Sequence, residues 1–212
     1  MIRNIEQSVR ETGQYLDREV LSDAVLQALR KVPRHRFVPE DQVDRAYENC
    51  PLPIGYGQTI SQPFIVAIMT DLLNLQPNHR VLEIGTGSAY QAAILSEIVS
   101  QVYTVEIVEE LAGSARERLK NLGYERIHVR QGDGYFGWES EAPFDAIVVT
   151  AAGSHIPPPL VQQLKAGGRM MIPVGSRSTI QQLVLVHKDL EGLVTSRQIL
   201  PVRFVPLTGD HP

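Results

Sequence analysis

The sequence predicts an α/β fold: an open, mostly parallel Rossmann-like sheet with helices on both faces, a helical N-terminal annex and an antiparallel C-terminal strand pair. Three observations lead to this prediction. Short apolar strands alternate with helical patterns between residues 80 and 174, which is typical of a parallel sheet covered on both faces. Helical periodicity precedes this region, and two strand-like runs with no helix between them follow it.

The N-terminal region, residues 1–78, is dominated by helical patterns. Residues 4–31 show helical periodicity, with Ser22 as a candidate N-cap, and residues 64–74 resume that periodicity. Between them, prolines and glycines punctuate residues 51–57. These residues predict an irregular passage rather than a regular element.

The central region, residues 79–175, carries the alternating pattern. Strands are expected at 80–85, 101–106, 126–131, 146–150 and 167–174, and helices at 89–99, 108–121 and 157–164. Residues 176–212 contain two further strand patterns, 180–188 and 193–205. Their connection, DLEGL, is short enough for a hairpin. We expect residues 1–212 to form a single domain.

Composition excludes several classes of function. With 43% apolar residues the chain can bury a core, and its net charge of −4 argues against duplex nucleic acid as a partner. Cys50 is the only cysteine, and the histidines show no metal-ligand spacing. The N-terminus is too charged for a signal peptide, and no apolar run is long enough to span a membrane. We therefore expect a cytoplasmic protein with no metal, no membrane association and no evident obligate protein partner.

A glycine loop follows the first central strand. Residues 83–88 read Glu-Ile-Gly-Thr-Gly-Ser, and glycines at a strand-to-helix turn allow a ligand to approach the backbone closely. Glu106 ends the next strand, 21 positions after Gly85, where a carboxylate can accept hydrogen bonds from both hydroxyls of a ribose. A glycine turn with an unrelated surface glutamate is the alternative. The order strand, turn, helix, strand and acid favours a ligand.

The ligand is indicated by what surrounds these glycines. Tyr90 stands where a dinucleotide fingerprint needs glycine or alanine. Methyltransferases that use S-adenosylmethionine instead place an acid two residues before G-x-G-x-G, and Glu83, Gly85 and Gly87 fit this pattern. Ala89 replaces the third glycine, and we expect the replacement to cost little because alanine is tolerated in the first turn of a helix. The pair Gly132-Asp133 follows the third strand, where such folds often meet adenine.

Two motifs that are missing from the sequence limit which chemical group can accept the methyl group. Residues 149–152, Val-Thr-Ala-Ala, lack the Pro-Pro-aromatic motif of enzymes that methylate nucleic-acid amines, and Cys50 is not in the Pro-Cys context of a cytosine-attacking thiolate. These absences favour an acceptor that needs no activation.

At this point the chain resembles the protein-L-isoaspartate O-methyltransferase family, which repairs damaged proteins. The resemblance covers nearly the whole chain. The glycine loop marks only the superfamily, whereas Thr59-Ile60-Ser61 before a proline, together with the distant Val205-Pro206-Leu207-Thr208, is specific to this family. Further motifs that carry the resemblance are RFVP (36–39), GDG (132–134), FDAI (144–147) and LKAGGR (164–169).

The resemblance implies roles for individual residues. Ser61 would be the active-site serine, and isoaspartyl-containing proteins and peptides the substrates. The residues implied to bind S-adenosylmethionine are Gln58, Thr59, Ile60, Glu83, Gly85, Thr86, Gly87, Ser88, Glu106, Gly132, Asp133 and Thr208. Those implied to border the substrate are Thr59, Ile60, Ser61, Val205, Pro206 and Leu207.

Two other readings remain open at this stage. The chain could methylate another protein or small-molecule carboxylate, or bind the cofactor without catalysis. Ser61 also lies just before Pro63, where it is a candidate N-cap of the following helix. Val66 stands where some relatives have a histidine near the cofactor, and it is given no role.

Overall fold

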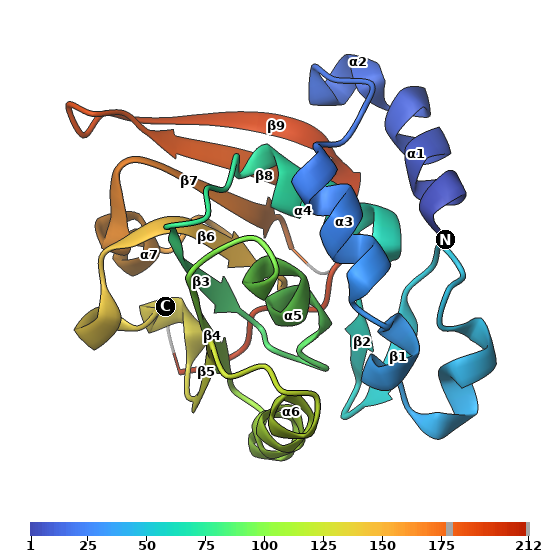
Figure 1. Cartoon of the computed structure of the whole chain (residues 1–212). Coiled ribbons are helices and arrows are strands. Elements are labelled where there is room, and N and C mark those ends of the chain that lie inside the picture. Colours follow the sequence, from blue (N-terminus) through green and yellow to red (C-terminus); the bar gives the residue numbers. More distant parts are fainter. Residues whose placement is uncertain (177–179, 211–212) are drawn as a thin grey trace.

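A seven-stranded sheet runs through the centre of the molecule (Figure 1), with strand order β5-β4-β3-β6-β7-β8-β9. The computed structural model describes residues 1–176 and 180–210. The strands of this sheet are β3 (Arg80–Ile84), β4 (Gln101–Glu106), β5 (Ile127–Gln131), β6 (Phe144–Val149), β7 (Leu164–Val174), β8 (Gln181–Lys188) and β9 (Val194–Val202).

The directions of these strands confirm the predicted mixed sheet. The five strands β5, β4, β3, β6 and β7, in their order in the sheet, are parallel to one another. Strand β8 is antiparallel to both of its neighbours, β7 and β9. The chain leaves β3 toward β4 on one side and later returns to β6 on the other, so β3 and β6 meet at a switch point. Ligands of open α/β sheets bind at the carboxyl ends of the strands at such a point.

Helices cover both faces of the sheet, as expected. Figure 1 shows α3, α4 and α5 packed beside one another on one face, and α3 contacts both of the others. The helices are α1 (Ile2–Glu11), α2 (Gly13–Leu16), α3 (Asp23–Lys31), α4 (Pro63–Leu72), α5 (Tyr90–Ser96), α6 (Glu109–Asn121) and α7 (Pro158–Gln163). Short 3₁₀ turns are η1 (Arg34–Phe37), η2 (Glu40–Arg45), η3 (Gly134–Phe136) and η4 (Glu139–Glu141).

Two apolar clusters form the core, one on each face of the sheet. Alternation along β3 shows the division, because Val81 belongs to the cluster beneath α1 and α3–α6, whereas Leu82 and Ile84 belong to the cluster beneath α7. None of the helices within the described residues is long and apolar enough to cross a membrane.

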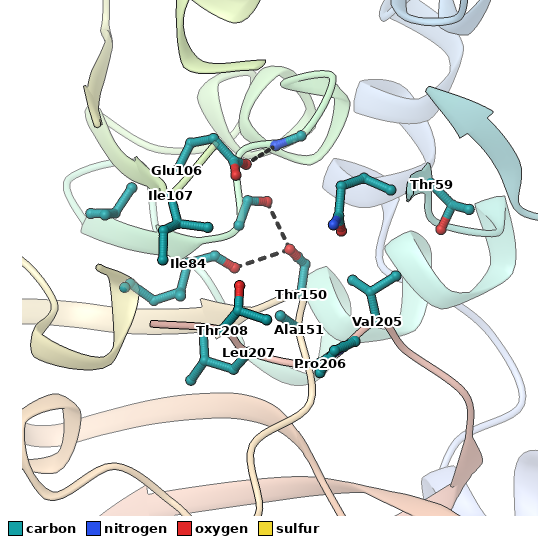
Figure 2. Close-up of a pocket in the computed structure, with 15 residues that line it drawn as sticks. Thr59, Ile84, Glu106, Ile107, Thr150, Ala151, Val205, Pro206, Leu207 and Thr208 are labelled. Atoms are coloured by element: carbon teal, nitrogen blue, oxygen red, sulfur yellow. Dashed lines mark hydrogen bonds between the residues drawn. The ribbon is translucent and has the colours of Figure 1, made fainter. Parts of the chain in front are cut away.

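A hairpin replaces part of the predicted irregular passage. Strands β1 (Leu52–Gly55) and β2 (Gln58–Ile60) pair antiparallel beside the main sheet. Tyr56 and the two glycines that flank it all have positive φ in the turn between the strands. The hairpin places Gln58 and Thr59 in the wall of a cavity that Ile84 and Thr150, at the ends of β3 and β6, also line. Figure 2 labels Thr59 in this wall.

Candidate active site

Thr150, the residue that follows β6, fixes the conformation of the glycine loop. Gly85 has a φ of +92°, and its N–H donates to the carbonyl of Val105 at 2.8 Å. The Thr150 hydroxyl donates to the carbonyls of Ile84 (3.0 Å) and Gly85 (2.7 Å). A Cβ at Gly85 would lie 2.5 Å from that hydroxyl oxygen. Both the backbone angle and the contact therefore require glycine at this position.

Ala89 corrects one expectation from the sequence. It is the N-cap of α5 rather than part of its first turn, and its φ of +69° lies in the left-handed region. That conformation costs roughly 1–2 kcal/mol for a residue other than glycine. The methyl group is completely buried, and burial of one such group returns about 0.8 kcal/mol. Alanine is tolerated because these two effects largely offset each other.

Glu106 lies where its spacing predicted, at the end of β4 and facing the glycine loop. Its carboxylate accepts hydrogen bonds from the N–H groups of Gly87 (2.7 Å) and Val108 (3.0 Å). Only 5% of the residue is exposed, yet it forms part of a cavity wall (Figure 2). The carboxylate is therefore oriented by the backbone, at the edge of a space that a ligand can enter.

This first cavity opens at the carboxyl ends of the central strands and contains about 540 Å³ of empty space, including space open to solvent. Figure 2 shows Thr150 between the Glu106 side of the cavity and the segment from Val205 to Leu207. The predicted residues in its wall are Gln58, Thr59, Gly85, Gly87, Glu106, Val205, Pro206, Leu207 and Thr208. Sequence reasoning missed Ile84, Val105, Ile107, Gly134, Thr150 and Ala151. Most of these missed residues lie at or next to the end of a predicted strand. Because ligands bind at the carboxyl ends of parallel strands, this position in the sequence could have identified them.

A second cavity contains Ser61. It holds about 950 Å³ of space, again partly open to solvent, and its wall also includes the exposed cation Arg203. Thr59, Thr150 and Val205 line both cavities. The two cavities therefore adjoin, with the glycine loop and Glu106 on one side and Ser61 on the other.

Several predicted site residues lie behind these walls. Glu83 is completely buried, and its carboxyl group accepts a hydrogen bond from the Thr104 hydroxyl at 2.5 Å. Thr86 is also buried, and its hydroxyl lies 2.7 Å from that of Thr104. Burial raises the pKa of Glu83 to about 8. These positions argue against direct contact of Glu83 and Thr86 with a ligand and favour support of the loop from below.

The remaining predicted cofactor residues also contact other parts of the chain. Ser88 is buried, and Ile60 packs in the core with 4% exposed. The N–H of Gly132 donates to the carbonyl of Glu106, at 2.8 Å. The Asp133 carboxylate accepts from the N–H of Tyr135 at 2.9 Å. None of the four is in the wall of the first cavity.

The C-terminal segment from Val205 to Thr208 is fixed to the end of β6. Ala152 donates its N–H to the carbonyl of Val205 and accepts from the N–H of Leu207, both at 2.8 Å. Just before this segment, the Gln181 side chain binds both backbone groups of Phe204. This wall of the site is therefore anchored by the sheet.

The predicted N-cap role of Ser61 is wrong. Gln62 is the N-cap of α4 and Pro63 is its first residue. The Asn49 side chain, distant in sequence, accepts from the N–H of Phe64 at 3.0 Å and so supplies the cap. Among the described residues the Ser61 hydroxyl has no hydrogen-bond partner, and the side chain is free to serve the cavity. No group of three or more His, Cys, Asp or Glu within residues 1–176 and 180–210 could hold a metal ion.

The mixed sheet, the glycine loop and the carboxylate at the end of β4 define the class of methyltransferases with a Rossmann-like fold. The profile of the protein-L-isoaspartate(D-aspartate) O-methyltransferase (PCMT) family matches residues 11–211. The chain is 60% identical over 211 residues to protein-L-isoaspartate O-methyltransferase 2 of Polaromonas sp. (strain JS666 / ATCC BAA-500), covering 100% of both chains. It is 55% identical to protein-L-isoaspartate O-methyltransferase 1 of Cupriavidus necator, covering 100% of this chain and 82% of the relative. The chain belongs to this family of S-adenosylmethionine-dependent protein-repair methyltransferases.

Solved structures agree with this assignment. A protein-L-isoaspartate O-methyltransferase of 28% identity superposes with a TM-score of 0.85, over 99% of this chain and 67% of that one. A protein described as a putative member of the family from Plasmodium falciparum, in complex with S-adenosyl-L-homocysteine, gives a TM-score of 0.79 at 24% identity. It covers 97% of both chains and supports the fold. The predicted family and fold are confirmed.

Proposed function

We propose that the protein transfers a methyl group from S-adenosylmethionine to the free α-carboxylate of L-isoaspartyl residues, with the donor in the first cavity and the acceptor in the second. The observation that carries this arrangement is the shared wall, because Thr59, Thr150 and Val205 line both cavities. A group bound in one cavity therefore meets a group bound in the other without crossing the protein interior.

The chemistry of the first cavity fits the donor. The Glu106 carboxylate can accept hydrogen bonds from ribose hydroxyls, and Ile84, Val105 and Ile107 offer an apolar surface for a purine ring. Gln58 and Thr208 add polar groups to the same wall. When bound, S-adenosylmethionine supplies an activated methyl group on its sulfonium.

The acceptor needs no general base. A free α-carboxyl has a reference pKa of about 3.3–3.7, so at neutral pH it is already an anion and a nucleophile. Ser61 donates its hydroxyl hydrogen to this carboxylate and directs one oxygen toward the first cavity. Arg203, in the same wall, attracts the anion. Alignment of the two reactants supplies most of the rate enhancement, and such positioning contributes about 7–11 kcal/mol in favourable cases.

The segment from Val205 to Leu207 borders the substrate chain. Two of its backbone groups already bind Ala152, and Pro206 has no N–H, so only the remaining backbone groups can pair with an extended peptide. Recognition through the main chain carries little information about neighbouring side chains. We therefore expect isoaspartyl sites in many sequence contexts to be accepted.

The experiment that tests the proposal is methyl transfer from labelled S-adenosylmethionine to two matched peptides, one isoaspartyl and one aspartyl. A base-labile methyl ester on the isoaspartyl peptide alone is the expected result. Label on a small-molecule carboxylate but on neither peptide would point to another acceptor. Donor binding without transfer to any acceptor would indicate a cofactor-binding module.

The lone cysteine, half-buried and unpaired in the structure, supports the further proposal that the protein works in a reducing compartment such as the cytoplasm.

A further inference from the structure

Arg34 is a completely buried arginine that connects separate parts of the molecule. It lies at the start of η1 and none of its surface is exposed. Its Nε donates to the carbonyl of Ala46 and its Nη2 to the carbonyl of Ser61, both at 2.8 Å. The second bond reaches the backbone of the residue proposed to hold the acceptor.

The same guanidinium also lies over an aromatic ring, that of Tyr90. Its central carbon lies 4.8 Å from the ring centroid of Tyr90. Tyr90 is the first residue of α5 and lies two positions after Ser88, the last residue of the glycine loop. Tyr90 is 1% exposed, and its ring packs edge-on against that of Phe37 with 5.6 Å between the ring centroids. The position that argued against a dinucleotide fingerprint thus supplies the aromatic surface on which Arg34 rests.

No carboxylate within the described residues forms an ion pair with Arg34. A buried charge without such a partner is costly, and burial lowers the pKa of the guanidinium. A hydrocarbon side chain of similar volume would avoid that cost, but it could not donate two directional hydrogen bonds to backbone carbonyls. The role of Arg34 therefore lies in those bonds.

We propose that Arg34 is a positioning residue for methyl transfer: it fixes the backbone of Ser61 relative to Tyr90 and the glycine loop, and so sets where the acceptor meets the donor. The inference rests on the proposed role of Ser61. Tyr90 is held by its own helix and by the core, whereas Ser61 lies in the two-residue connection between β2 and α4. Loss of the arginine bond should therefore displace Ser61 rather than the donor loop.

The test is Arg34→Lys, because lysine keeps the charge but replaces the planar fork by a single point donor. We expect kcat with an isoaspartyl peptide to fall by about 10- to 100-fold, since a displacement of about 1 Å costs up to about 100-fold. The dissociation constant of S-adenosylhomocysteine, measured by calorimetry without peptide, should change less than about threefold, a difference well under one tenfold step in affinity. Arg126→Lys is the matched control, because Arg126 also donates to backbone carbonyls, those of Ser96 and Val99, at the other end of α5. It should leave both quantities unchanged.

A double-mutant cycle separates positioning from a general effect on the fold. If Arg34 acts through Ser61, the double variant Arg34→Lys, Ser61→Ala should be no slower than Ser61→Ala alone. Multiplied losses, or full activity of folded Arg34→Lys, would overturn the inference. Arg34→Gln, which keeps a hydrogen-bond donor but removes the charge, is measured in the same way as a second variant. If S-adenosylhomocysteine affinity and kcat fall together in both Arg34 variants, Arg34 has only a general role in stabilising the fold, and the inference is overturned as well. Wild-type transfer to the isoaspartyl peptide, and its slowing by Ser61→Ala, test the proposed function separately.

Discussion

Gly85→Ala tests how the glycine loop is built. The new Cβ would lie 2.5 Å from the hydroxyl oxygen of Thr150, and the backbone would keep a φ of +92°. Backbone strain in the left-handed half of the map costs roughly 1–2 kcal/mol. Overpacking of a filled site adds about 1–3 kcal/mol. The expected loss in free energy of unfolding is therefore about 2–5 kcal/mol, against the 5–15 kcal/mol that is typical of a whole protein.

A second substitution separates the two contributions. Thr150→Ala removes the clashing oxygen, and the next nearest atom of that residue is its Cβ at 3.7 Å, an ordinary contact. Alone it should cost about 1 kcal/mol for the lost hydrogen bonds. Combined with Gly85→Ala, it should cost about 1–3 kcal/mol less than the sum of the single changes, because the overpacking is relieved. Gly87→Ala is the matched control: its φ is +51° and the nearest contact is the flexible end of Ile54 at 3.2 Å. Only the strain of about 1–2 kcal/mol should appear there.

Urea unfolding, followed by circular dichroism for all four variants and the wild type, measures these differences. Strict additivity of Gly85→Ala and Thr150→Ala would refute the clash as the source of the loss. Equal losses at Gly85 and Gly87 would show that backbone strain alone decides both positions.

Three further predictions concern neighbouring residues. Glu106→Gln should raise the KM for S-adenosylmethionine about tenfold or more, since hydrogen bonds to a charged group contribute about 1.5–3 kcal/mol, and initial rates should show the peptide KM unchanged. Burial raises the pKa of Glu83 from 4.5 to about 8, so between these values the folded state binds the proton more tightly and stability falls as the pH rises. Glu83→Gln should remove this fall, which amounts to up to about 1.4 kcal/mol per pH unit. Urea unfolding of wild type and variant across pH 5–9 measures the free energy of unfolding at each pH, and equal slopes against pH for the two proteins would contradict the prediction. Ala89→Gly should change stability by less than about 1 kcal/mol, because the relief of strain and the lost methyl burial nearly cancel; a larger change in urea unfolding would show that one of them dominates.

Much of the fold could be predicted because its central elements have regular hydrophobic patterns. Each predicted strand and helix of the central region is present, since buried parallel strands read as apolar runs and their glycine turns mark the boundaries. The position of Glu106 also followed from sequence, because its strand pairs in register with the strand that carries the glycine loop. Local pattern was sufficient where local structure decides the geometry.

The remaining features depend on contacts between distant residues. The hairpin of β1 and β2 was not predicted because its strands are only four and three residues long and Pro53 interrupts the first of them. The cap of α4 comes from the Asn49 side chain, which accepts a hydrogen bond from the N–H of Phe64, 15 residues later in the chain. The left-handed backbone at Ala89 and the burial of Glu83 beneath the loop likewise follow from tertiary packing. Periodicity and spacing contain no signal for these arrangements.

Ser61 is proposed to hold the acceptor carboxylate against the donor without contributing to the stability of the fold. Steady-state and single-turnover methyl transfer to an isoaspartyl peptide by Ser61→Ala tests this role most directly. The expected rate is lower by about 10- to 150-fold, the equivalent of one hydrogen bond to a charged group. The affinity for S-adenosylhomocysteine and the free energy of unfolding should stay close to wild type. An unchanged rate in that variant would show that the Ser61 hydroxyl does not hold the acceptor.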